Sequence, residues 1–177
     1  MSDRQKQRDD VYSAMAELQS TLSKDENTKL GCIIVGSDNT IVSAGYNGSI
    51  SGFDDDLIPY SREQKQLSYY ENGEKILFTE NKYPFISHAE SNAIFFADKQ
   101  RLIDSTLYVT GFPCIACAIQ IARAKIRRVV VKQTRNTNDH NSMVYINNDY
   151  KIQKYIFAQA KIQLFVDDVE IMLDLCL

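Results

Sequence analysis

Two short motifs in this sequence hold the residue types that hydrolytic zinc chemistry requires. The first is His88-Ala89-Glu90 and the second is Pro113-Cys114-Ile115-Ala116-Cys117. A catalytic zinc ion usually has three protein ligands and leaves its fourth position to water, whereas a structural zinc usually has four protein ligands. One histidine and two cysteines make three ligands. The motifs therefore predict a catalytic zinc site formed by His88, Cys114 and Cys117.

Glu90 follows the predicted histidine ligand by two residues, close enough to belong to the site without binding the metal. Zinc lowers the pKa of its bound water toward ~7, which makes hydroxide available at neutral pH. The order H-x-E followed by P-C-x-x-C is typical of zinc enzymes that deaminate cytosine or adenine. In such a reaction, we expect Glu90 to take a proton from this water, deliver one to a ring nitrogen of the substrate and help ammonia leave.

Each motif alone has a plainer interpretation. A C-x-x-C pair can be a redox pair or two buried thiols, His88 can cap a helix, and Glu90 can be a solvated helix residue. Both motifs nevertheless occur in order in a chain that has only two histidines and four cysteines. Their joint occurrence favours the zinc site.

Length and composition indicate a single domain over residues 1–177. Apolar residues make up 44% of the chain and charged residues 24%, as in ordinary globular proteins. The other two cysteines, Cys32 and Cys176, do not suggest a disulfide framework. Residues 1–10 lack the apolar core of a signal peptide, and no stretch approaches ~18 apolar residues. We expect a cytoplasmic protein, in the host cytoplasm if it is viral, with no membrane partner.

The net charge of −3 and the pI of about 5.4 argue against a broad nucleic-acid-binding face, so no nucleic-acid partner is expected. We interpret the one basic run as a solvated helix end and strand edge; it consists of Lys125, Arg127, Arg128, Lys132 and Arg135. A phosphate group needs only one or two cations, so a small nucleotide is compatible with this charge.

Hydrophobic periodicity predicts alternating helices and strands. Helices are expected over residues 10–22, 87–98, 116–124 and 150–160. Strands are expected over residues 30–35, 41–46, 106–110, 128–132 and 162–166, and residues 167–175 have a weak helical pattern. This order predicts an α/β fold with a mixed five-stranded sheet flanked by helices. Right-handed crossovers would place the two metal-binding helices side by side.

Two long segments do not fit a minimal sheet. About residues 49–86 form an insert rich in charge and tyrosine, and residues 133–148 are polar and rich in asparagine. Loops of this length in compact domains tend to be functional or disordered, and either segment could cover the site. We interpret His140, in the second segment, as a solvated loop residue and not a metal ligand.

The chain resembles the deoxycytidylate (dCMP) deaminases of eukaryotes and large DNA phages, within the zinc-dependent cytidine deaminase superfamily. The resemblance runs from about residue 11 to 166. Besides the metal motifs, it is carried by Ser23-Lys24-Asp25-Glu26-Asn27, Gly45-Tyr46-Asn47-Gly48-Ser49, Asp55-Asp56, Lys82-Tyr83-Pro84, the context His88 to Ile94, and Tyr108-Val109-Thr110.

The resemblance implies a three-layer cytidine-deaminase-like fold and hydrolytic conversion of dCMP to dUMP, which supplies dTMP synthesis. It also implies a homohexamer that is activated by dCTP with Mg²⁺ and inhibited by dTTP. Some phage relatives bind a second zinc through extra cysteines and histidines. The insert of this chain contains neither residue type, so one Zn²⁺ per subunit is expected.

The resemblance also implies nucleotide contacts. The candidates for the sugar and base of the substrate are Asn47, Ala89, Asn92 and Thr110, and those for its phosphate are Lys99, Ser23, Lys24 and Lys29. The candidates for the regulatory nucleotide are Asn47, Gly48, Gly52 and Asp55. Asn47 precedes a glycine, so turn formation is an equally plain interpretation of it.

Other functions stay open at this point. The same chemistry on dCTP or on another cytosine or adenine substrate is one alternative, and a non-catalytic nucleotide-binding scaffold is another. The family's usual proline in the Gly-Tyr-Asn-Gly loop is replaced by Ile50, which leaves the strength of regulation open.

Overall fold

A six-stranded sheet forms the centre of the computed structural model, which describes residues 2–25, 27–50, 52–54, 57–132 and 140–174, without the side chains of 140–149. Strands β7, β8 and β9 run parallel, β1 is antiparallel to β2 and β7, and β10 is antiparallel to β9. In spatial order, the strands are β10 (Val169–Ile171), β9 (Gln163–Val166), β8 (Arg128–Val131), β7 (Thr106–Val109), β1 (Gly31–Val35) and β2 (Ile41–Tyr46). The mixed sheet and the β1–β2 hairpin confirm the prediction.

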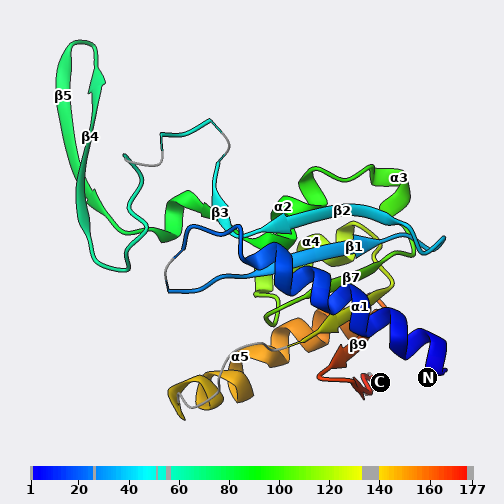
Figure 1. Cartoon of the computed structure of the whole chain (residues 1–177). Helices are drawn as coiled ribbons and strands as arrows, with labels where there is room; N and C mark the ends of the chain where they lie inside the picture. Colours follow the sequence, from blue (N-terminus) through cyan, green and yellow to red (C-terminus); the bar gives the residue numbers. More distant parts are fainter. Residues whose placement is uncertain (1, 26, 51, 55–56, 133–139, 175–177) are drawn as a thin grey trace.

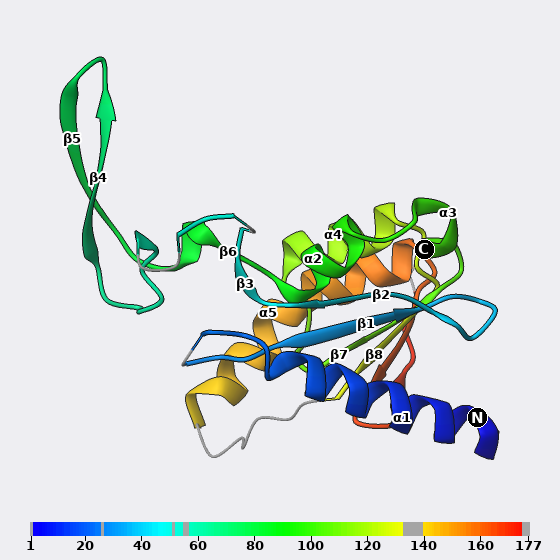
Figure 2. The same ribbon diagram turned by 45° about the horizontal axis from the view of Figure 1, so that its top comes forward.

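Helices cover both faces of the sheet, so the domain has three layers (Figures 1 and 2). One face is covered by α1 (Asp3–Ser20), and the other by α2 (Ala89–Phe95), α4 (Ile115–Arg123) and α5 (His140–Gln159). The short α3 (Lys99–Leu102) follows α2. The predicted α/β class with helices on both faces is confirmed.

The alternation of side chains along each strand builds two separate cores. In β1, Ile33 and Val35 pack with Ala16 of α1, whereas Cys32 and Ile34 pack on the opposite face with residues of α2, α4 and α5. The neighbouring strands β7 and β8 follow the same alternation. Both faces of the sheet are therefore buried.

The sheet has one strand more than the five predicted, and the helical pattern over residues 167–175 was misleading. Asp167 and Asp168 have φ values of 47° and 69° and form a two-residue turn, after which Val169 pairs with Val166. Positive φ at both turn residues is typical of the tight turns that join antiparallel strands, and aspartate tolerates it. The turn adds β10 to the sheet edge.

Three predicted helices also have different bounds. The first helix begins at Asp3 and not at residue 10, because the Ser2 hydroxyl accepts a hydrogen bond from the Gln5 amide (3.3 Å) and caps it. The helix predicted over residues 87–98 is α2 alone and ends at Phe95; α3 follows it, and Asp98 caps α3 by accepting from the Gln100 amide (2.9 Å). The helix predicted over residues 150–160 begins at His140, so the interpretation of His140 as a loop residue is wrong.

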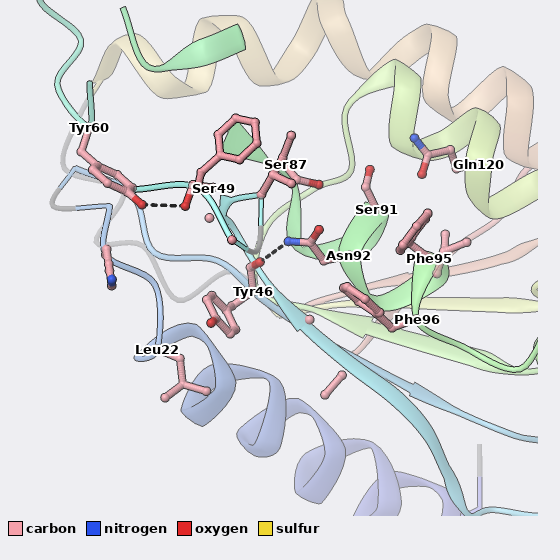
Figure 3. A pocket seen from close by; sticks show the side chains of 18 residues that line it. Leu22, Tyr46, Ser49, Tyr60, Ser87, Ser91, Asn92, Phe95, Phe96 and Gln120 are labelled. Atoms are coloured by element: carbon pink, nitrogen blue, oxygen red, sulfur yellow. Dashed lines mark hydrogen bonds between the residues drawn. The ribbon is translucent and has the colours of Figure 1, made fainter. Parts of the chain in front are cut away.

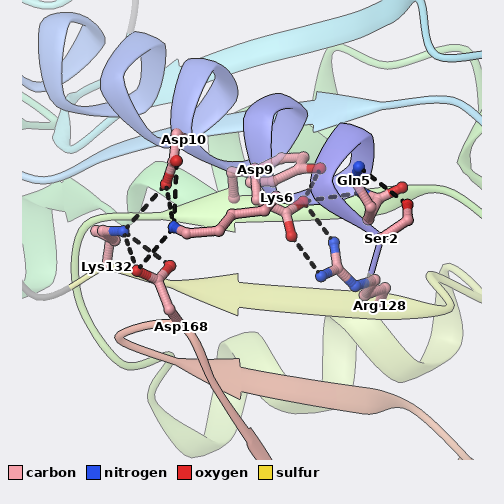
Figure 4. A network of polar contacts seen from close by, with 9 residues as sticks. Ser2, Gln5, Lys6, Asp9, Asp10, Arg128, Lys132 and Asp168 are labelled. Carbon is pink, nitrogen blue, oxygen red and sulfur yellow. Dashed lines mark hydrogen bonds and ion pairs between the residues drawn. The ribbon is translucent and has the colours of Figure 1, made fainter.

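Polar contacts attach α1 to the sheet (Figure 4). The Arg128 guanidinium donates to both carboxylate oxygens of Asp9, at 2.7 and 2.6 Å, and both side chains are buried. Burial raises the pKa of Asp9, but hydrogen bonds from Arg128, Gln5 and Tyr108 outweigh it, and the pKa lies below 3.8. The interpretation of Arg128 as part of a solvated basic run is therefore wrong.

The insert begins and ends at one short strand pair. Gly48 pairs with Ser87 and Ser49 with Ile86, in strands β3 (Gly48–Ser49) and β6 (Ile86–Ser87). Between them lie β4 (Lys65–Glu71), β5 (Glu74–Glu80) and the 3-10 turn η2 (Tyr83–Phe85). Among the described residues, no helix is long and apolar enough to span a membrane.

Candidate active site

The first metal motif lies at the start of α2, which packs closely against β2. His88 is the residue before the helix, and Glu90 is in its first turn. A Cβ atom added at Gly45 of β2 would lie 2.3 Å from the Ala89 carbonyl oxygen and 2.6 Å from the Ala93 amide nitrogen. Glycine at position 45 therefore permits the approach of α2 to the sheet that places both site residues.

The second metal motif lies at the start of α4. Cys114 is the N-cap residue, and its sulfur accepts a hydrogen bond from the Cys117 amide at 3.5 Å. The Nδ1 atom of His88 lies 3.4 Å from the Cys114 sulfur and 3.3 Å from the Cys117 sulfur. The predicted pairing of the two helix starts is confirmed.

The three candidate ligand atoms fit one zinc ion. They lie within 4.8 Å of one another. Bonds of ~2.3 Å to sulfur and ~2.0–2.1 Å to nitrogen in a tetrahedron separate a sulfur from a nitrogen ligand by ~3.5 Å. The observed nitrogen–sulfur distances agree with this value, so His88, Cys114 and Cys117 form a site that suits zinc.

The charge state of the cluster also suits a cation. Hydrogen bonds from Cys117 and His88 lower the pKa of Cys114 to about 3. The pKa of Cys117 is raised, because its hydrogen bond to Cys114 and its burial favour the thiol. A thiolate that is already formed beside a histidine is the state in which cysteine binds metal.

Glu90 is buried beside this cluster, with 3% of its surface exposed. Its Oε2 atom has no hydrogen-bond partner within the described part of the chain. Burial raises the pKa of the Glu90 carboxyl group. A buried carboxylate with an open acceptor position is suited to hold and transfer a proton.

A cleft of about 960 Å³ lies beside α2 (Figure 3); its lining contains neighbours of His88 and Glu90 in the sequence and not these residues themselves. Ser87, Ser91 and Asn92, which flank His88 and Glu90 in sequence, line one wall. The Asn92 amide donates to the Tyr46 carbonyl oxygen at 2.8 Å, which links α2 to the end of β2. The other lining residues are Leu22, Lys24, Ala44, Gly45, Tyr46, Gly48, Ser49, Ile50, Gly52, Phe53, Tyr60, Ile94, Phe95, Phe96 and Gln120.

Several predicted substrate contacts are engaged with the protein itself. Asn47 accepts from the Leu30 amide at 2.7 Å and donates to the Thr28 carbonyl oxygen at 2.8 Å. Ser23 donates to the Asn47 carbonyl oxygen at 2.7 Å, and Thr110 accepts from the Gly31 amide at 3.0 Å. These contacts shape the loops beside the cleft. Ala89 is fully buried in the core, and a nucleotide contact for each of these residues stays a prediction.

The predicted phosphate residues are separated in the structure. Lys24 lines the cleft, Lys29 is exposed in the same loop, and Lys99 is the exposed first residue of α3, outside the cleft lining. Of the predicted regulatory residues, Gly48 and Gly52 line the cleft. Asp55 lies outside the described residues, and the side chain of His140, the first residue of α5, does too.

A buried ion pair that was not predicted joins the insert to the loop before β1. The Lys82 ammonium lies 2.5 Å from Asp25 Oδ2, and the two side chains are only 4% and 3% exposed. Asp25 Oδ1 also accepts from the amides of Asn27 and Thr28. Both residues belong to motifs that carried the family resemblance, but no local pattern pairs residues so far apart in the sequence.

The three-layer fold, the three converging ligands and the buried glutamate together define the class of zinc-binding deaminases. Residues 6–133 match the family model described as the cytidine and deoxycytidylate deaminase zinc-binding region. This chain belongs to that family, and within it to the dCMP deaminase family.

The relatives include eukaryotic and phage proteins. The chain is 38% identical over 125 residues to a protein named probable deoxycytidylate deaminase of Caenorhabditis elegans, covering 71% of this chain and 57% of that one. It is 36% identical over 131 residues to human deoxycytidylate deaminase, covering 71% and 67%. The chain thus spans little more than half of the nematode relative.

A solved structure shows the same fold. The dCMP deaminase of cyanophage S-TIM5, in complex with dCMP and dUMP, superposes with a TM-score of 0.59 at 23% identity, covering 94% of this chain and 98% of that one. This likeness concerns the fold alone.

Proposed function

We propose that this protein catalyses the hydrolytic deamination of dCMP to dUMP. The observation that carries the proposal is the buried Glu90, whose open carboxylate oxygen lies beside the cluster of His88, Cys114 and Cys117. A purely structural metal site has no use for such a carboxylate. The substrate is proposed from the relatives that bear the name deoxycytidylate deaminase.

The residues of this chain have distinct parts in the proposed reaction. Zn²⁺ held by the three ligands would supply a Lewis acid that activates a water molecule. Glu90 accepts a proton from the water, passes a proton to N3 of the cytosine ring and assists the departure of the amino group as ammonia. The reaction consumes one water molecule and one dCMP and yields one dUMP and one ammonia.

The cleft is the proposed nucleotide site. The cleft borders α2. A nucleotide whose base reaches Glu90 would therefore place its sugar and phosphate near Lys24, Ser49 and Tyr60. The hydroxyls of Ser49 and Tyr60 are hydrogen-bonded to each other at 2.9 Å. Lys24 and Lys29 are the proposed phosphate contacts. Asn92 is proposed to contact the substrate from α2.

The proposal also covers the regulation of the enzyme and its assembly. We infer activation by dCTP with Mg²⁺, inhibition by dTTP and assembly of identical chains up to a homohexamer. Gly48 and Gly52 lie in the cleft lining, which supports a nucleotide contact near the start of the insert.

Ammonia release from zinc-loaded protein tests this proposal. dCMP, dCTP and deoxycytidine are offered separately, each with and without dTTP. Turnover of dCMP that dTTP suppresses is expected. Preference for dCTP would retain the chemistry and overturn the proposed substrate, and no ammonia from any of the three would leave the scaffold interpretation.

A further inference from the structure

The β4–β5 hairpin, called the arm below, extends away from the rest of the molecule (Figures 1 and 2). Its seven-residue strands are joined by Asn72-Gly73, with φ values of 50° and 87°. Asn-Gly with two positive φ angles is the preferred two-residue hairpin turn. The arm is therefore a hairpin specified by its own sequence.

One face of the arm, called its apolar face below, has four large apolar side chains at its centre and charged residues at both ends, whereas the opposite face has two, Tyr70 and Leu77. Leu67 is paired with Phe78 and Tyr69 with Ile76, and residues that pair directly lie on the same face. The rings of Tyr69 and Phe78 are 6.2 Å apart, yet these side chains remain 50% and 40% exposed. A lone two-stranded sheet is only marginally stable in water, so this face requires a partner surface.

The cleft has an exposed aromatic rim of matching character. Phe53, Phe95 and Phe96 line the cleft and are 51%, 79% and 68% exposed. At ~200 Å² for each ring, these side chains alone present ~400 Å² of apolar surface, within the ~300–600 Å² of the largest apolar patch on a typical monomer, which is often functional. The arm of the same chain extends away from α2, the helix that ends at Phe95 (Figure 1).

We propose that the apolar face of the arm docks on the aromatic rim of a second copy of this chain, and that two copies exchange arms. This inference rests on the proposed self-assembly and assigns it a surface. The insert starts and ends at the β3–β6 pair, and Ser49 and Ser87 of that pair line the cleft. Each docked arm would therefore connect the cleft of its own chain to the cleft of the second copy.

Charge also fits this partner. Glu71 and Glu74 lie directly opposite each other at the arm tip, and like charges in that position destabilise a hairpin. Lys24 is the one charged residue among the described residues that line the cleft. The acidic tip is therefore complementary in charge to the cleft that it approaches.

The size of the contact suits a weak, reversible association. A seven-residue strand is ~24 Å long and a two-stranded ribbon is ~10 Å wide, so one face of the arm covers ~240 Å². Two exchanged arms and the two surfaces that they cover amount to ~960 Å², in the size range of transient protein interfaces.

Paired charge variants of the full chain test the proposal by analytical ultracentrifugation. Tyr69→Lys with Phe78→Lys places charges on the apolar face and is expected to weaken self-association at least tenfold. The matched control, Tyr70→Lys with Leu77→Lys, changes the opposite face of the same hairpin and is expected to associate within twofold of the unchanged protein. Equal association of both variants would overturn the proposal.

Cross-linking between different chains tests it without relying on those variants. Phe78→Cys chains are mixed with Phe96→Cys chains, both zinc-loaded and carrying Cys176→Ser, and treated with a short bismaleimide. The yield of cross-links between the two kinds of chain is expected to be at least tenfold higher than in a control mixture, in which Leu77→Cys chains replace the Phe78→Cys chains. No excess over this control would contradict the exchange.

Ammonia release from dCMP is measured on the same samples, so the two proposals can fail separately. An unchanged protein that is active but monomeric at all concentrations would remove the self-assembly and the arm contact and leave the proposed chemistry standing.

Discussion

Glu90 is the residue on which the proposed chemistry depends most. A carboxylate that is 3% exposed and has no partner for Oε2 among the described residues is costly to bury, and the position of Glu90 beside three metal-binding side chains accounts for this cost. His88 and the cysteines could be assigned from sequence because their spacing within each motif is local. The burial of Glu90 could not, because it depends on the packing of α2 against β2.

Replacing Glu90 with glutamine is expected to lower dCMP turnover by about 10³-fold or more while zinc remains bound. Glutamine keeps the size of the side chain but cannot take up a proton from water, and general acid–base groups contribute ~10²–10⁴-fold. Turnover and zinc content are measured together. The control is Glu170→Gln on exposed β10, which is expected to retain both; full turnover by the Glu90 variant would remove its proposed role.

The two elements that carry the ligands are positioned by close packing as much as by their sequences. Gly45 has no room for a Cβ atom because the Ala89 carbonyl oxygen would lie 2.3 Å from it. Gly45→Ala is expected to displace α2, weaken zinc binding and cost about 1–3 kcal/mol of stability. Zinc titration and urea unfolding measure these effects. Gly48→Ala, where the nearest atom is 3.5 Å away, is the control and is expected to bind zinc normally.

The buried pair of Asp9 and Arg128 makes the attachment of α1 dependent on pH. The folded pKa of Asp9 lies below 3.8, so its contribution to stability is present above pH 3.8 and is lost as the pH falls through the folded value. Asp9→Asn is expected to cost about 3–5 kcal/mol near pH 7 because it leaves Arg128 buried and unpaired. Urea unfolding measured at several pH values should show the stability difference between the unchanged protein and the Asp9→Asn variant become smaller in acid. A difference that stays constant with pH would contradict a folded pKa of Asp9 below its usual value.

The pair of Lys82 and Asp25 makes a similar prediction for the insert. Lys82→Met alone leaves a buried carboxylate and is expected to cost about 3–5 kcal/mol, whereas Lys82→Met with Asp25→Leu is expected to recover most of that loss. A double-mutant cycle in urea measures the coupling. Additive losses would show that the two side chains do not stabilise each other.

The sequence predicted those elements whose signals are local. The periodic helices and the β1–β2 hairpin follow from patterns within each segment. The prediction failed where distant residues decide the structure: β10 depends on an open sheet edge at β9, and Arg128 is buried because it meets Asp9 of α1. No hairpin was predicted over the arm, although Asn72-Gly73 between its two strands is a strong local hairpin signal.

At the scale of the whole molecule, one zinc per chain should hold the starts of α2 and α4 together. Removal of zinc with a chelator is expected to lower the melting temperature and abolish dCMP turnover, because three ligands from two helices lose their common partner. Zn²⁺ should restore both properties and Mg²⁺ neither. Metal analysis that gives two tightly bound zinc ions per chain would contradict the single site.

The most direct test of the central claim follows the atoms of the reaction. Zinc-loaded protein is incubated with dCMP in ¹⁸O-labelled water, and product mass and ammonia are measured over time. The proposed hydrolysis predicts dUMP that carries one ¹⁸O atom and one ammonia released for each dUMP formed. Unchanged dCMP after incubation with protein that holds one zinc per chain would contradict it.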